Sequence, residues 1–111
     1  MSKLSYTWWP YVRNMIRRYP KRLKCDNLTR VDLLETDAVA TAMNKTATKP
    51  DGRDRLELIR LTYWRRSKVT LQRAAMDIPV SYSTAKRWNR EFFLDVAEAF
   101  GIYDPPDPEQ E

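Results

Sequence analysis

The side chains best suited to contact another molecule gather between residues 70 and 90. The second half of this stretch carries hydroxyl and basic groups between apolar ones, and the side chains expected to face outward are Tyr82, Ser83, Thr84, Lys86, Arg87 and Arg90. Arginine can bond both acceptors on the edge of a guanine, and serine or threonine can donate or accept. These residue types at this spacing predict contacts to the base edges of duplex DNA.

Two short helices and a tight turn would present these groups. Thr70 is placed to cap a helix over residues 71–77, Ile78-Pro79-Val80 supplies the turn, and Ser81 is placed to cap a longer helix. The apolar side chains between the two helices would be those of Ala74, Ala75, Ile78, Val80, Ala85 and Trp88. The pattern is that of a helix-turn-helix, whose second helix enters the major groove.

The distribution of charge supports a polyanionic partner. The 111-residue chain has a net charge of +5. Residues 1–25 hold seven basic and no acidic side chains, residues 60–90 hold eight basic against one acidic, and residues 91–111 hold seven acidic and no basic. Two basic blocks and an acidic end indicate an oriented molecule with one face toward phosphates.

Phosphate contacts are expected from groups that flank the base-contacting helix. The candidates near the helix-turn-helix are Arg65, Arg66, Lys68, Thr70, Arg73 and Ser81. A second group lies on the first predicted helix and comprises Arg13, Arg17 and Arg18, followed by Lys21, Arg22 and Lys24. Such contacts add affinity and fix the register of the protein on DNA without distinguishing sequences.

The remaining chain also follows helical patterns. A first helix is predicted over 7–19, capped by Thr7 and ended by Pro20, and a polar connector over 21–30. A second helix is predicted over 31–44, with Leu34, Val39, Ala42 and Met43 among its buried positions. A third, over 53–65, has an apolar stripe wide enough to pack on two sides, and the last helix ends near Phe100 before Gly101. We expect an all-α fold of about five helices, with a helical region over 1–50, a helix-turn-helix region over 51–101 and an acidic, disordered tail over 102–111.

The composition argues against several classes of function. The chain has no histidine and only two glycines, so we expect neither an enzyme nor a cofactor or metal site. Cys25 is the sole cysteine and has no second thiol or histidine to activate it, so we expect it to be inert. No apolar run approaches the length of a membrane span, and we expect the protein in the cytoplasm.

The stretch from Leu58 to Val96 resembles the promoter-reading carboxy-terminal domain of bacterial sigma factors. Residues Thr70, Leu71, Ala75, Val80 and Ser81 match that domain's Thr-Leu-x-x-[Ile/Val]-Ala…Gly-[Ile/Val]-Ser pattern. The sequence departs from the pattern at Pro79, where glycine is usual, and at Ala74, where a larger apolar residue is usual. The resemblance implies that Tyr82, Ser83, Lys86 and Arg87 contact DNA.

The layout of the whole chain resembles the RinA and ArpU group of phage transcriptional regulators. The shared features are the length, an opening helix that reaches Tyr19-Pro20, a central helix and a terminal sigma-like helix-turn-helix. The resemblance implies a sequence-specific activator of phage late genes that acts with the RNA polymerase of a bacterial host.

Other functions remain open at this point. A small terminase subunit also uses a helix-turn-helix but assembles into rings, and the sequence has no sustained heptad repeat. An interaction module that binds an acidic protein would also be basic. Homo-oligomerisation is open too, and either Trp8 or Trp9, which are adjacent, could be exposed as a protein contact.

Overall fold

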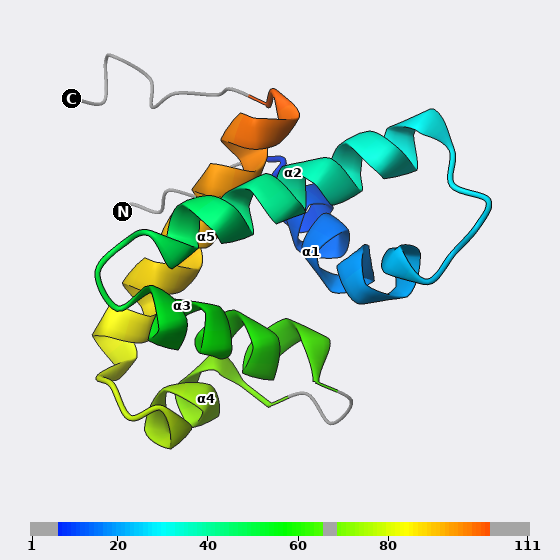
Figure 1. The fold of residues 1–111 in the computed structure, drawn as a ribbon. Coiled ribbons are helices and arrows are strands. Elements are labelled where there is room, and N and C mark those ends of the chain that lie inside the picture. Colours follow the sequence, from blue (N-terminus) through cyan, green and yellow to red (C-terminus); the bar gives the residue numbers. More distant parts are fainter. Residues whose placement is uncertain (1–6, 66–68, 103–111) are drawn as a thin grey trace, which may run out of the picture.

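The computed structural model describes residues 7–65 and 69–102 of the chain. Its elements are α1 (Trp9–Leu23), α2 (Arg30–Ala47), α3 (Gly52–Ile59), the π-helical turn η1 (Arg60–Trp64), α4 (Leu71–Asp77) and α5 (Tyr82–Phe100). Helix α2 passes in front of α1 and α5 in Figure 1, and α3, η1 and α4 form the lower half of the molecule. No strand occurs in either described range, and the expected all-α fold of about five helices is confirmed.

Helix α1 continues through a proline that was expected to end it. Pro20 lies inside the helix, which ends at Leu23. Because proline has no N–H, the carbonyl of Ile16, four residues earlier, loses its helical partner. The indole Nε1 of Trp64 donates to that carbonyl over 2.6 Å. A side chain of η1 therefore replaces the missing bond, and the connector shortens to the residues after Leu23.

The start of α1 also differs from the prediction. Its N-cap residue is Trp8 rather than Thr7, no side chain caps the helix, and Pro10 lies in the first turn. Trp8 and Trp9 are both half-buried and pack against the core. The ring of Trp9 stacks on Phe93 with 4.5 Å between centroids, and Trp8 lies 5.5 Å from Trp9. Both tryptophans thus help to hold α1 on α5.

Helix α2 is one residue longer at its start than predicted and three longer at its end. A capping box begins it, because Thr29 Oγ1 accepts from the Asp32 amide and the Asp32 carboxylate accepts from the Thr29 amide. Val39 and Ala42 are buried as expected. Leu34 was expected to be buried but is 53% exposed, and the next residue, Glu35, is buried instead.

Glu35 is buried because α1 supplies partners for its carboxylate. The hydroxyl of Tyr11 and the guanidinium of Arg22 both donate to it, and Arg22 also lies 3.0 Å from a carboxylate oxygen of Asp32. A buried carboxylate is tolerated only when it is paired in this way. This pairing fixes the rotation of α2 about its axis and turns Leu34 outward.

Helix α3 and η1 pack on two sides, as the wide stripe predicts. Ile59 and Tyr63 contribute to a large core cluster with α1, α2 and α5, whereas Leu58 and Leu61 contribute to a smaller one with α4. A Cβ on Gly52 would lie 2.6 Å from the carbonyl oxygen of Thr46. Only glycine therefore lets the start of α3 approach the end of α2 this closely.

Helix α5 belongs to both clusters and joins them rigidly. Phe92, Phe93, Val96 and Ala97 lie in the large cluster, and Ala85 and Trp88 lie in the small one. Gly101 ends the helix in the left-handed conformation (φ 98°), as predicted. Ile102, placed in the tail by the sequence analysis, instead packs against the core, and its amide bonds to Ala97. Residues 103–111 of the predicted tail lie outside the described ranges.

Candidate nucleic-acid interface

Local hydrogen bonds build the predicted helix-turn-helix. Thr70 Oγ1 accepts from the Arg73 amide and starts α4, and Ser81 Oγ accepts from the Thr84 amide and starts α5, both over 3.1 Å. Between them, the Val80 amide closes the turn on the carbonyl of Ala75 over 2.8 Å. Both predicted caps and the turn are confirmed, and the Ile78–Pro79 peptide is cis.

Small side chains bring the two helices close together. Ala74 and Ala75 of α4 are buried against Ala85 and Trp88 of α5, and α3 covers them from a third side. Ile78 and Val80 pack at the edge of the same cluster. The interior positions predicted from the sequence are therefore correct, and the opposite side of α5 is left for solvent.

The first turns of α5 expose most of the predicted base-contacting residues. Tyr82, Ser83, Lys86, Arg87 and Arg90 are exposed and share one face of the helix. Thr84 is half-buried, and its hydroxyl accepts from Ser81 Oγ over 2.8 Å. Thr84 therefore supports the cap, and the other five residues form the surface that we call the α5 face.

Arg87, one of the two arginines of the α5 face, is weakly held. Arg87 Nε lies 3.9 Å from Glu91, and the Arg87 side chain is 61% exposed. Arg55 of α3 binds the same carboxylate at 2.5 Å, and this hydrogen bond is the main cause of the lowered pKa of Glu91. Because Arg55 holds the carboxylate, the Arg87 guanidinium can turn toward a ligand.

Aromatic and basic groups also meet on this face. Lys86 Nζ lies 4.8 Å from the centroid of the Tyr82 ring, a cation–π contact at the surface. The first turn of α5 contains no acidic residue. The amides at a helix start and these cations together favour an anion.

The phosphate candidates next to the helix-turn-helix are also accessible. Arg65, Thr70, Arg73 and Ser81 are exposed, and Arg73 has only a 3.6 Å contact to Asp77. Gln72, which was not among the predicted contacts, is exposed beside Arg73. The candidates Arg66 and Lys68 lie outside the described residues.

The basic side chains of α1 divide into three groups. Arg17 and Arg18 are exposed, and so are Lys21 and Lys24. Arg13 is half-buried, 6.0 Å from the centroid of the Phe93 ring. The prediction that Arg22 contacts phosphate is wrong. Its guanidinium is bound to Glu35 and Asp32, and its side chain is only 11% exposed.

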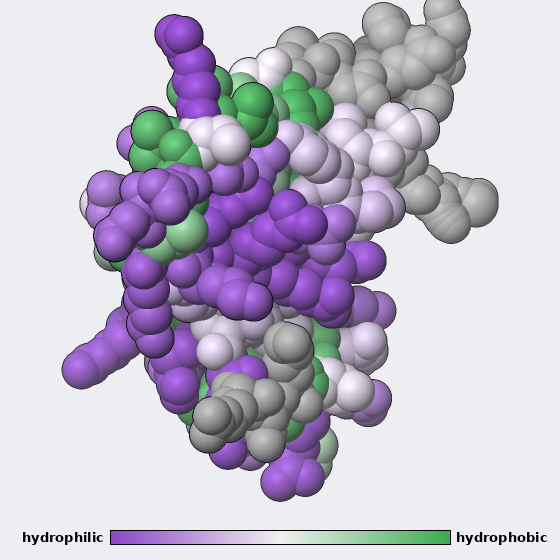
Figure 2. All heavy atoms as spheres, turned by 90° about the vertical axis from the view of Figure 1, so that its right-hand side faces the viewer, coloured by the Kyte–Doolittle hydropathy of each residue, from purple (hydrophilic) through white to green (hydrophobic). Residues whose placement is uncertain are grey.

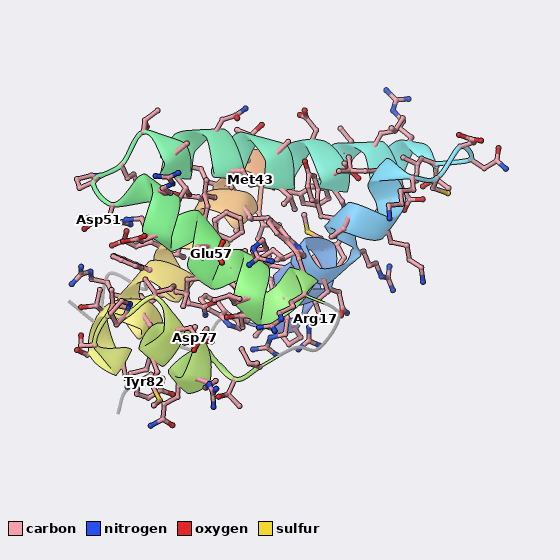
Figure 3. The ribbon with its side chains drawn as sticks, turned by 60° about the horizontal axis from the view of Figure 1, so that its bottom comes forward. Arg17, Met43, Asp51, Glu57, Asp77 and Tyr82 are labelled. Atoms are coloured by element: carbon pink, nitrogen blue, oxygen red, sulfur yellow. The ribbon has the colours of Figure 1, made fainter. Side chains whose placement is uncertain are left out.

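The α1 cations lie away from the α5 face. In Figure 3, Arg17 lies beside the end of η1, at the right of the view. Tyr82, the first residue of α5, lies at the lower left, beside α4. Hydrophilic side chains fill the middle of the face shown in Figure 2, which is the right-hand side of Figure 1. The labelled cation of α1, Arg17, and the first residue of the α5 face, Tyr82, therefore lie in separate parts of the molecule.

The acidic residues of α5 are neutralised within the fold. Glu91, Asp95 and Glu98 pair with Lys45, Lys49 and Arg55 from α2 and α3. These partners come from the central part of the chain, and the two basic blocks contribute only the 3.9 Å contact of Arg87 to Glu91. The net positive charge therefore remains on α1 and the start of α5, since Asp77 offsets Arg73 within α4.

In the described part of the chain, the Cys, Asp and Glu side chains form no group of three or more that could bind a metal ion. Cys25 is exposed and forms no disulfide. The described helices include none with the length and apolar character needed to cross a membrane.

Comparison with known proteins returned no match among protein-family models, curated proteins or solved structures. The case for a function therefore depends on the geometry above.

Proposed function

We propose that this protein is a sequence-specific double-stranded-DNA-binding transcriptional regulator. The proposal depends on one observation: five of the six predicted base-contacting residues of α5 stand exposed on a helix-turn-helix, with no acidic residue in the first turn of that helix. An α-helix fits the major groove, and its first turns reach the base edges. Arg87 is the proposed guanine contact, and Tyr82, Ser83, Lys86 and Arg90 supply the neighbouring contacts.

The phosphate contacts are assigned to exposed cations and helix starts. Arg73, Thr70 and Ser81 lie at the starts of α4 and α5, where backbone amides also point outward. Arg65 precedes α4, and Arg17 and Arg18 extend the basic surface along α1. This attraction is independent of sequence and weakens with salt.

The resemblance to the RinA and ArpU group supports a more specific role. On that basis the protein is a phage late-gene activator that binds near a promoter and acts with the RNA polymerase of a bacterial host. The enzyme classes set aside on composition remain outside the proposal.

Binding-site selection from a random duplex pool tests the proposal. A regulator of this kind should enrich one motif, and a gel shift should then show tighter binding to that motif than to a shuffled duplex of equal length. Arg87→Ala should relax the preference at one base pair, while the matched change Arg53→Ala, on the exposed start of α3, should leave it. Enrichment of no motif, with equal binding to both duplexes, would overturn sequence-specific recognition.

A further inference from the structure

Helix α2 carries two leucines on its outer side. Leu33 and Leu34 are 55% and 53% exposed, and Leu33 lies on the side of the helix opposite the buried Ala42. Residues three, four and seven positions apart share a helix face, so Arg30, Leu33, Leu34 and Asp37 form one stripe. All four are exposed, and Figure 1 shows no described element in front of α2.

The two charged ends of this stripe have no ion-pair partner within residues 7–65 and 69–102. Arg30 and Asp37 lie seven residues apart and carry opposite charges. Elsewhere on α2, Asp32, Glu35 and Lys45 all form ion pairs with other helices. The stripe is therefore an apolar centre between one free cation and one free anion.

This stripe is complementary to the same stripe on a second, antiparallel copy of the helix. Two antiparallel copies of α2, related by a two-fold axis between Leu33 and Leu34, would place each Leu33 against the other copy's Leu34. The same axis brings Arg30 of each copy level with Asp37 of the other, so that two ion pairs flank four leucines. An isologous contact of this kind closes on itself and yields a dimer.

The surroundings of the stripe extend the apolar surface. Leu23, at the end of α1, and Val31 are 61% and 52% exposed. Apolar residues reach the surface in the upper part of Figure 2, on the side where α2 begins. Exposed apolar side chains that gather in one area, with polar residues around them, mark interaction sites.

We propose that the chain forms a two-fold symmetric dimer through the outer face of α2, with Leu33 and Leu34 at its centre and reciprocal Arg30–Asp37 pairs at its edges. A second copy fits better than an unrelated protein because both the charges and the leucines match under the two-fold operation. The dimer would present two helix-turn-helix units. Its existence is measured without DNA and is independent of the proposed function.

Charge exchange on the full-length protein tests this pairing. Sedimentation equilibrium up to about 0.5 mM, a range that detects dissociation constants of about 0.1 mM, should give a mass that rises with concentration toward twice the 13.2 kDa of the chain. Arg30→Asp or Asp37→Arg alone places like charges at both edges and should raise the dissociation constant at least about tenfold. The double variant restores both pairs in reversed order and should recover the wild-type constant.

Two further variants complete the test. Leu34→Asp should leave only monomer, with a helical circular-dichroism spectrum that shows the fold is intact. Arg53→Asp, an exposed charge change on α3, should leave the dimer unchanged. A wild-type protein that stays monomeric at every concentration would overturn the proposal. A double charge exchange that fails to recover the dimer would overturn the two-fold pairing.

Discussion

Replacing Trp88 by alanine should destabilise the helix-turn-helix by about 3 kcal/mol. Trp88 is 4% exposed and packs against Ala74, Ala75 and Ala85, whose short side chains cannot fill the space it leaves. A large-to-small change at such a site costs about 3–5 kcal/mol through lost burial and a persistent cavity. Loss of the Arg55 contact, 5.4 Å above the ring, adds about 0.5–1 kcal/mol.

An opposing contribution comes from the indole nitrogen. Trp88 Nε1 is buried and has no hydrogen-bond partner among the residues that the structure describes. An unsatisfied buried donor costs about 1–3 kcal/mol, so its removal offsets part of the loss. Trp88→Phe removes the donor but keeps most of the volume and should therefore cost less than about 1.5 kcal/mol.

Urea unfolding followed by far-UV circular dichroism measures these differences. The matched variant is Phe92→Ala, which removes a buried ring that has no polar atom and should cost about 3–5 kcal/mol. The expected order of destabilisation is Phe92→Ala, then Trp88→Ala, then Trp88→Phe. A Trp88→Ala protein that unfolds at the wild-type midpoint would show that Trp88 is not buried. A Trp88→Phe variant as unstable as Trp88→Ala would show instead that the indole N–H has a partner.

Four other changes test the interface and the contact between α1 and α2. Arg87→Ala should weaken binding to the selected motif by about 1–3 kcal/mol in a fluorescence-anisotropy titration and relax the preference at one base pair; unchanged specificity would remove Arg87 from base recognition. Arg73→Ala should weaken all duplexes alike and lower the slope of log K against log salt by about one, whereas a loss restricted to one sequence would contradict a phosphate contact. Glu35→Ala should cost about 3 kcal/mol in urea unfolding, because it leaves the Arg22 guanidinium buried with one partner fewer; a midpoint like that of the wild type would show that the pair contributes nothing. The hydrogen bond to Glu35 raises the pKa of Tyr11 from 10.0 to about 12. The free energy of unfolding of the wild type should therefore exceed that of Tyr11→Phe by its full amount below pH 10, and this difference should disappear as the pH rises through 12. A difference that grows over this interval would refute the assignment.

Local sequence signals predicted the helix-turn-helix well. Thr70, Ser81 and Gly101 start or end their helices through hydrogen bonds to residues only a few positions away, so these ends need no tertiary information. The apolar spacing along α5 was equally informative, because one face of that helix is buried along nearly its whole length. The exposure of Lys86 and Arg87 follows directly from that periodicity.

The errors arose where a distant side chain decided the outcome. Pro20 was expected to end α1, but the Trp64 indole satisfies the carbonyl that the proline leaves free. Arg22 was assigned to phosphate together with its basic neighbours, but two carboxylates of α2 bind it. Neither contact has a signal in the nearby sequence, because Trp64 is 48 residues from Ile16 and Glu35 is 13 residues from Arg22.

The sequence by itself determined the helical class, the caps, the turn and the basic edge of α5, because these depend on residue type and on neighbours within one or two turns. Only the tertiary structure decided the rotation of α2, since Glu35 is buried through its bonds to Tyr11 and Arg22 and Leu34 is thereby turned outward. The periodicity of α2 alone cannot separate these outcomes, because a carboxylate is stable in the interior only where another helix brings a hydrogen-bond donor and a cation to it.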